Sequence, residues 1–175
     1  MADNDRQTGK ADTRPVIFLY TDGASSGNPG PGGYGVVLRC GPLRKEMSGG
    51  FACTTNNRME LLAVITGLEA VKWDNAVVEV YSDSTYVVKA VQEGWLQNWQ
   101  RKGWKKVKNV DLWTRFLEVY SRHRVTFHWL KGHAGHPENE RCDALAVDAG
   151  AGAVARGEVL PEDAGFRTEE NLLSL

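Results

Sequence analysis

Four acidic side chains stand where a folded chain could gather them for metal chemistry. Asp22 ends an apolar segment over residues 15–22, and Asp83 follows a second one over residues 76–81. Glu60 lies in the first turns of the helix predicted between them, and Asp143 lies early in the last predicted helix. Crowded carboxylates repel one another, and a hard divalent cation such as Mg²⁺, which prefers oxygen ligands, relieves that repulsion. Two such ions about 4 Å apart can activate a water and stabilise the leaving oxygen of a phosphodiester.

Each acid also has a plain structural explanation when it is taken alone. Asp22 could be a turn aspartate, Asp83 a helix N-cap, and Glu60 or Asp143 could interact with a helix dipole. Their joint placement favours a metal site instead. Strands joined by a helical crossover run parallel, so both aspartates should meet at one edge of the sheet, where α/β folds build their sites.

The elements that must position these acids follow from the apolar pattern. β-formers and turn residues predict strands at 15–22, 34–40, 43–51, 76–81 and 125–130, and the second and third form a hairpin. Helices are predicted after Asn56 or Asn57, which can cap the first, after Asp83 or Ser84, either of which can start the second, and over 111–122 and 139–149. The order predicts an α/β fold with a mixed five-stranded sheet and helices on both faces.

The length of 175 residues suits one domain, which we assign to residues 15–149. Residues 1–14 form a polar leader that we expect to be disordered, and residues 150–175 form an acidic tail whose composition is compatible with disorder. No apolar run is long enough for a membrane span, and the polar N-terminus is unlike a signal peptide. Three cysteines without CxxC spacing favour reduced thiols in a cytoplasmic protein over disulfides or a zinc site.

The net charge of −1 hides an asymmetry along the chain. Residues 157–175 hold five acids and one arginine, whereas residues 101–108 hold five cations, no acid and Trp104. A basic segment with an aromatic side chain is a candidate nucleic-acid surface, although a solvated helix face has the same composition.

Six motifs, in order over residues 15–149, resemble the bacterial type-one ribonuclease H family. They are YTDG at 20–23, GNPGPGGYG at 27–35, TTNNRMEL at 54–61, SDS at 82–84, KNVDLW at 108–113 and KGHAGHPENERCD at 131–143. The resemblance implies a ribonuclease H fold with a short basic protrusion. It also implies an endonuclease that hydrolyses the RNA strand of RNA–DNA hybrids by a two-metal-ion mechanism and leaves 5′-phosphate and 3′-hydroxyl ends.

The same resemblance implies the catalytic residues. Asp22, Glu60, Asp83 and Asp143 fall on the family's four metal-binding acids, which are expected to hold two Mg²⁺ ions, with Mn²⁺ as a substitute. His133 falls on the catalytic-loop histidine, whose glycine-flanked position suits proton handling at the leaving group or product release. We expect no organic cofactor and a monomer.

The resemblance further implies how the hybrid is held. Asn28, Asn56 and Asn57 are expected in the minor groove, and Glu60 near a 2′-hydroxyl, the group that distinguishes RNA. The DNA strand is expected at a phosphate pocket formed by Thr55 and Asn109 and at an aromatic platform formed by Trp95. Further phosphates are expected to contact Lys102, Lys105, Lys106 and Lys108.

Three features depart from the family pattern. Cys53 stands where the family often has an arginine in the DNA-phosphate pocket, and Thr85 stands where bacterial relatives often have glutamine. The segment between Trp104 and Val107 is several residues shorter than expected, which predicts lower or more salt-sensitive affinity for the hybrid.

Three other functions are compatible with parts of this pattern. A junction resolvase or transposase-like nuclease shares the fold, but the TNN run and the basic segment disfavour it. A catalytically silent hybrid-binding module would not need the complete set of acids. A small-molecule enzyme is the weakest alternative, because the glycine-rich loop matches neither GxGxxG nor GxxxxGK[ST].

Overall fold

The computed structural model describes residues 13–132 and 134–167. Its strands are β1 (Ile17–Ser25), β2 (Gly30–Cys40), β3 (Leu43–Thr54), β4 (Val77–Ser82) and β5 (Arg124–Trp129). They form one five-stranded sheet in the order β3-β2-β1-β4-β5. β1, β2 and β3 pair antiparallel, whereas β1 with β4 and β4 with β5 pair parallel. The predicted mixed sheet is therefore confirmed.

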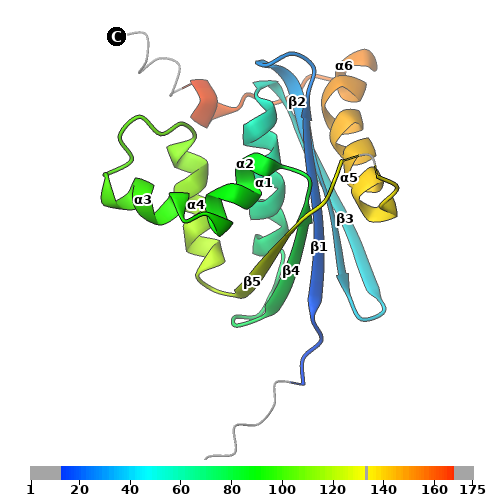
Figure 1. Cartoon of the computed structure of the whole chain (residues 1–175). Helices are drawn as coiled ribbons and strands as arrows, with labels where there is room; N and C mark the ends of the chain where they lie inside the picture. Colours follow the sequence, from blue (N-terminus) through cyan, green and yellow to red (C-terminus); the bar gives the residue numbers. More distant parts are fainter. Residues whose placement is uncertain (1–12, 133, 168–175) are drawn as a thin grey trace, which may run out of the picture.

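The helices lie on both faces of this sheet (Figure 1). On one face are α1 (Asn56–Glu69), α2 (Thr85–Gln92), α3 (Trp95–Arg101) and α4 (Val110–Tyr120). On the other are α5 (Pro137–Val147), a π-helical turn (Asp148–Gly152) and α6 (Ala153–Ala155). The tryptophan-rich segment, to which the apolar pattern assigned no element, forms α3. No helix in the described ranges is long and apolar enough to cross a membrane.

The core lies between the sheet and α1, whose residues from Arg58 to Ile65 are all buried. Alternation along the strands explains this arrangement, because Ile17 and Leu19 of β1 and their register partners Val78 and Val80 of β4 are all buried on one face of the sheet. On the opposite face α5 packs closely on β2. A Cβ atom on Gly35 would lie 2.1 Å from the carbonyl oxygen of Cys142, so this approach requires glycine.

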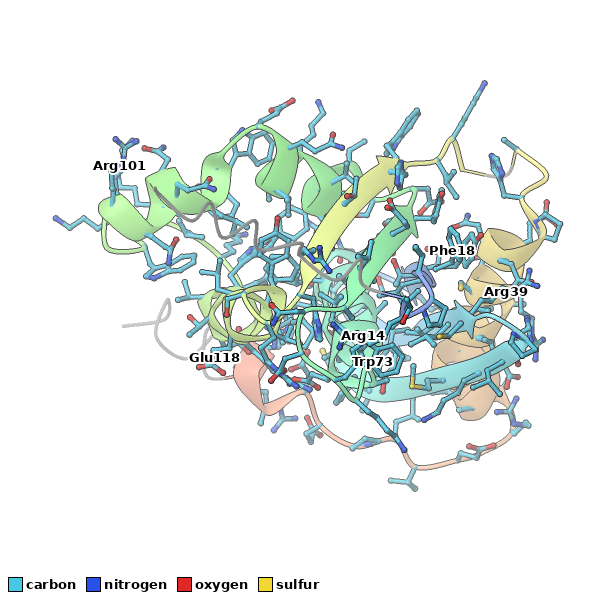
Figure 2. All side chains as sticks on the ribbon, turned by 90° about the horizontal axis from the view of Figure 1, so that it is seen from below. Arg14, Phe18, Arg39, Trp73, Arg101 and Glu118 are labelled. Carbon is cyan, nitrogen blue, oxygen red and sulfur yellow. The ribbon has the colours of Figure 1, made fainter. Side chains whose placement is uncertain are left out.

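The basic segment lies at one end of the molecule. α3 and residues 102–109 form a protrusion whose tip includes Arg101, away from the sheet residues Phe18 and Arg39 (Figure 2). Trp99 at its base contacts Trp113 of α4, with ring centroids 5.5 Å apart. The predicted short basic protrusion is therefore present, and aromatic packing anchors it to the core.

Candidate active site

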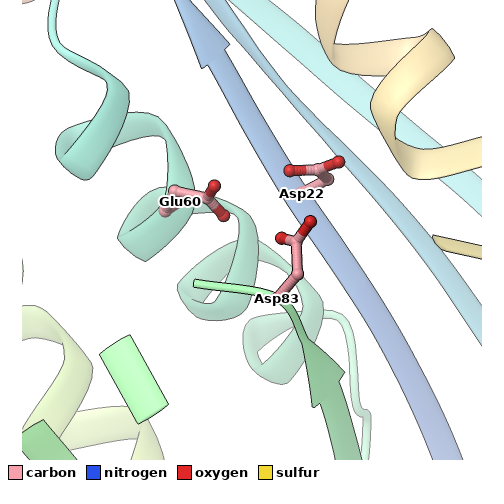
Figure 3. A group of neighbouring side chains, drawn as sticks. All are labelled: Asp22, Glu60 and Asp83. Atoms are coloured by element: carbon pink, nitrogen blue, oxygen red, sulfur yellow. The ribbon is translucent and has the colours of Figure 1, made fainter. Parts of the chain in front are cut away.

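Three of the predicted acids meet at the edge of the sheet where β1 and β4 run side by side. Thr21 pairs with Ser82 in the parallel register, so Asp22 and Asp83 follow at the same level of neighbouring strands. Glu60 reaches them from α1 (Figure 3). One carboxylate oxygen of each residue lies within 4.8 Å of the others.

Close packing of α1 on β1 brings Glu60 into this group. A Cβ atom on Gly23 would lie 2.3 Å from the backbone nitrogen of Glu60, so only glycine allows the helix to pass this near. Thr55 caps α1, and its hydroxyl accepts a hydrogen bond from the Arg58 backbone N–H at 3.3 Å. The cap fixes where the helix begins and, with it, the turn that carries Glu60.

The three acids are largely withdrawn from water. Asp22 and Glu60 are each 6% exposed, and Asp83 is half-buried. The Gly23 backbone N–H donates to Asp22 Oδ1 at 2.8 Å, whereas Glu60 Oε2 is buried and has no hydrogen-bond partner among the described residues. A buried carboxylate oxygen without a partner is costly, and this oxygen faces two further acids.

Burial raises the pKa of Asp22 to about 7, and the charge of Asp83 adds to the rise. Burial, followed by the charges of Asp22 and Asp83, also raises the pKa of Glu60 well above its ordinary value. The site is thus short of positive charge. An all-oxygen donor set with this deficit fits a hard divalent cation such as Mg²⁺.

Asp143 lies in the second turn of α5, the helix on the face of the sheet opposite to α1. It is half-buried, and its charge contributes to the raised pKa of Asp22. It is not among the acids whose oxygens lie within 4.8 Å of one another. The fourth predicted acid is therefore near the group but set apart from its other members.

His133 lies outside the described residues. Its neighbour Gly132 is close to the acids, because a Cβ atom there would lie 2.9 Å from Asp83 Oδ2. Trp129 at the end of β5 donates its indole N–H to the Asp83 backbone carbonyl at 3.1 Å. The apolar pattern did not indicate this last contact, which ties β5 to the turn that carries Asp83.

The asparagines predicted to contact nucleic acid lie beside the acids. Asn28, in the exposed loop between β1 and β2, accepts a hydrogen bond from the Asn56 backbone N–H at 3.1 Å. Asn57 is exposed in the first turn of α1. The loop and the helix start thus form one surface next to Glu60.

Thr55 and Asn109 come from distant segments and meet around one buried arginine. Arg58 donates its backbone N–H to Thr55 Oγ1 and its Nη1 to Asn109 Oδ1 at 3.3 Å. Asn109 Nδ2 in turn donates to the Tyr86 hydroxyl at 3.0 Å. Burial alone would lower the pKa of Arg58, but hydrogen bonds with Asp111 and Asp163 outweigh this effect and raise it. Sequence patterns gave no signal for this arginine, because its partners lie 53 and 105 residues away.

The remaining predicted contacts belong to the protrusion. Trp95 begins α3, is half-buried and packs against Trp99 with ring centroids 6.1 Å apart. The four predicted lysines, which are Lys102, Lys105, Lys106 and Lys108, are all exposed, and no ion pair joins them to an acid in the part of the chain that is described. Their charges are available to a polyanion.

A sequence model of the RNase H family matches residues 14–151. Ribonuclease H of Desulforamulus reducens is 58% identical over 138 residues, which cover 76% of this chain and 86% of the relative. Ribonuclease H of Nitratidesulfovibrio vulgaris strain Miyazaki F is 53% identical over 160 residues, which cover 89% of this chain and 99% of the relative.

Solved structures show the same similarity. LC9-RNase H1, a type 1 RNase H with the type 2 active-site motif, superposes with a TM-score of 0.73 at 32% identity, over 82% of this chain and 75% of that one. LC11-RNase H1, solved in complex with an RNA/DNA hybrid, superposes with a TM-score of 0.58 at 28% identity, over 79% of this chain and 99% of that one.

Proposed function

The chain belongs to the ribonuclease H family, and we propose that it hydrolyses the RNA strand of RNA–DNA hybrids at the group formed by Asp22, Glu60 and Asp83. The cut leaves a 5′-phosphate and a 3′-hydroxyl. The observation that carries this proposal is the convergence of three buried or half-buried carboxylates, from β1, from α1 and from the turn after β4, at one sheet edge.

Two Mg²⁺ ions fit this donor set, and Mn²⁺ is an alternative. Asp22 and Asp83 would hold the ions, and Glu60 and Asp143 would hold one ion each. When bound, the ions would supply an activated water and charge stabilisation at the leaving oxygen. The orphaned Oε2 of Glu60 and the raised pKa of Asp22 support this assignment, since both indicate acids that lack a cation.

The protein's own side chains orient the RNA strand. Asn28, Asn56 and Asn57 read the minor groove, and Glu60 accepts from the 2′-hydroxyl beside the cut. The hydrogen bond between Asn56 and Asn28 supports a single recognition surface, because it links the β1–β2 loop to the helix that carries Glu60. His133 assists departure of the leaving group or release of the product.

The DNA strand is held farther from the acids. Thr55 and Asn109 form a phosphate pocket, Trp95 is the aromatic platform, and the four exposed lysines contact further phosphates. Cys53 leaves this pocket without the usual arginine, and Arg58 does not replace it, because its side chain is buried and committed to two acids. Neutral donors therefore hold this phosphate, and most of the salt dependence of hybrid binding comes from the lysines.

We also propose that the protein acts as a monomer in the cytoplasm without an organic cofactor. The cysteines Cys40, Cys53 and Cys142 are unpaired, as expected in a reducing compartment. Gel filtration with light scattering tests the oligomeric state; a mass of about twice 19.3 kDa would contradict it.

A comparison of substrates tests the proposed activity. Purified protein is incubated with Mg²⁺ and labelled RNA–DNA hybrid, duplex DNA, duplex RNA or a four-way junction. We expect cleavage of the hybrid alone, in its RNA strand. Preferential cleavage of the junction would assign the site to a resolvase, and binding of the hybrid without cleavage would indicate a silent binding module.

A further inference from the structure

The acidic tail begins with a segment that packs on the body of the protein. Residues 158–167, which we call the strap, cross β3, where the Ala52 backbone N–H donates to the Pro161 carbonyl at 2.8 Å. Residues 164–167 form a helical turn beside α1 and α4 (Figure 1), and the Phe166 side chain is 9% exposed. The strap is therefore a built part of the fold.

Asp163 is the polar anchor of the strap. It is 7% exposed, and both of its carboxylate oxygens are used. Oδ2 accepts from the Thr54 hydroxyl and from Arg58 Nε, each at 2.7 Å. Oδ1 accepts from Arg58 Nη2 at 2.8 Å and from the Phe166 backbone N–H at 3.3 Å. The carboxylate thus joins the strap to the residue before Thr55 and to the arginine at the start of α1.

The Arg58 side chain links Asp163 to Asn109. A guanidinium has five N–H groups, and every one of them has a protein acceptor here. Two go to Asp163, two to Asp111 at 2.8 and 2.9 Å, and one to Asn109 Oδ1 at 3.3 Å. Because the guanidinium is planar and fully occupied, Asp163 and Asp111 together fix the point from which it donates to Asn109.

The geometry of Asn109 depends on that donor. Its φ of 60° lies in the left-handed region, where a residue other than glycine is held at an energetic cost. Its Oδ1 accepts from Arg58 and its Nδ2 donates to the Tyr86 hydroxyl, so the amide has one orientation. Thr55 contacts the same residue only through the backbone N–H that it caps, a bond that does not depend on the guanidinium.

We propose that the strap is a positioning device for the DNA strand: Asp163 orients the Arg58 guanidinium, which holds the Asn109 side chain in the arrangement that receives a phosphate. This inference rests on the proposed function, which assigns Asn109 to the DNA-phosphate pocket. Asp163 is a positioning residue, since its contacts are all with protein atoms. The strap thereby couples the C-terminal segment to substrate affinity while leaving the catalytic acids untouched.

Steady-state cleavage of an RNA–DNA hybrid tests this proposal with Asp163→Asn, which keeps the shape of the side chain and removes its charge. We expect KM for the hybrid to rise about tenfold, the cost of a misplaced contact. The kcat should stay within about twofold, because the chemistry at the acids is unchanged. A loss confined to kcat, or an unchanged KM, would overturn the proposal.

A stability control separates positioning from a structural role. Ile17 is 1% exposed at the end of β1 far from the site, and Ile17→Val lowers the melting temperature without contacting the strap. We expect its KM to equal that of the wild type. A rise in KM that follows the melting temperature in both variants would make the strap merely structural and overturn the proposal.

A double variant identifies the route of the effect. In an Asn109→Ala background the increase in KM caused by Asp163→Asn should shrink to about twofold, because the two residues act in one chain of contacts. Fully additive increases would overturn the route through Asn109. If Asn109→Ala alone leaves KM unchanged, both the phosphate pocket of the proposed function and the role of the strap are wrong. If Asn109→Ala raises KM and Asp163→Asn does not, the pocket is supported and only the role of the strap is wrong.

Thr54→Val provides the test if Asp163→Asn does not fold. This variant keeps the ion pair and removes only the hydroxyl that donates to Asp163. The expected increase in KM is about threefold, which is the effect of losing one buried hydrogen bond. An unchanged KM in a folded Thr54→Val protein would overturn the proposal.

Discussion

Two clusters of buried charge share helix α1, and they are built in opposite ways. Around Arg58, which is 1% exposed, every guanidinium N–H has an acceptor, and the arginine pairs with buried Asp163 and exposed Asp111. Two residues farther along, Glu60 meets two further acids, Asp22 and Asp83, and one of its buried oxygens has no hydrogen-bond partner among the described residues. The first cluster is complete within the protein, whereas the second is complete only with a ligand.

This difference teaches how to distinguish structural from functional charge in the molecule. A fold that can bring an arginine to two acids from segments 53 and 105 residues away is able to pair a buried carboxylate, that of Asp163, with its own side chains. The acids at the sheet edge are left unneutralised in the same fold, and their repulsion favours binding of a cation from solution.

The largest expected effect is on catalysis. Asp22→Asn should lower kcat at least about a thousandfold, or about 4 kcal/mol in activation free energy, because it removes a carboxylate of the proposed metal site. Asp148→Asn, at an exposed acid outside both clusters, is the matched control and should retain full activity. Hybrid cleavage with Mg²⁺ measures both, and wild-type activity in Asp22→Asn would refute the assignment of the site.

The clusters should also respond with opposite signs when a charge is removed. Arg58→Met should lower the free energy of unfolding by about 3 kcal/mol, because it leaves buried Asp163 unpaired. Glu60→Gln should be neutral or stabilising in the absence of metal, because it relieves repulsion. Urea unfolding in a chelator measures both. Arg115→Met, which breaks an exposed ion pair, is the control and should cost less than about 1 kcal/mol; equal losses at Arg58 and Glu60 would erase the contrast.

The pH dependence of stability follows from the raised pKa of Asp22. Between its ordinary 3.8 and about 7 the folded state binds a proton that the unfolded state has released. The free energy of unfolding of the metal-free protein should therefore fall as pH rises through this window, by at most about 1.4 kcal/mol per unit. The urea midpoint of the wild type minus that of Asp22→Asn isolates this contribution. The difference should shrink as pH rises, and a difference that grows with pH would contradict the prediction.

The smallest effect concerns the exposed charges of the protrusion, which belong to neither cluster. Replacing Lys105 and Lys106 with glutamine should weaken hybrid binding and reduce the slope of log affinity against log salt by about 2, since each phosphate contact contributes about 0.9. Lys45→Gln, at an exposed position of β3, should leave the slope unchanged. An unaltered slope in the protrusion variant would exclude these lysines from the interface.

The sequence was sufficient to predict the sheet and the meeting of Asp22 and Asp83. Both depend on local signals, namely apolar strands that end in an aspartate and a helical crossover that makes those strands parallel. The five strands and their mixed pairing are confirmed. The closeness of Glu60 was less accessible to prediction, because it depends on Gly23 letting α1 approach β1.

The Arg58 cluster was beyond prediction for a physical reason. Its acids come from α4 and from the strap, and composition shows only an acidic tail without saying where any one carboxylate docks. The same applies to α3, because a helix of seven residues is too short for its apolar residues to establish a period. The roles of His133 and of the nucleic-acid contacts stay predictions.

The central claim is that the sheet-edge acids form a cation site that the protein leaves incomplete, and calorimetric titration with Mg²⁺ tests it most directly. The account predicts saturable binding to wild-type protein, binding that is lost in Asp22→Asn and unchanged in Asp148→Asn. Arg58→Met is unsuitable here because of its expected instability, so Asp163→Asn represents the Arg58 cluster and should bind as the wild type does. Binding that is equally strong in Asp22→Asn, or no binding to the wild type, would contradict the account.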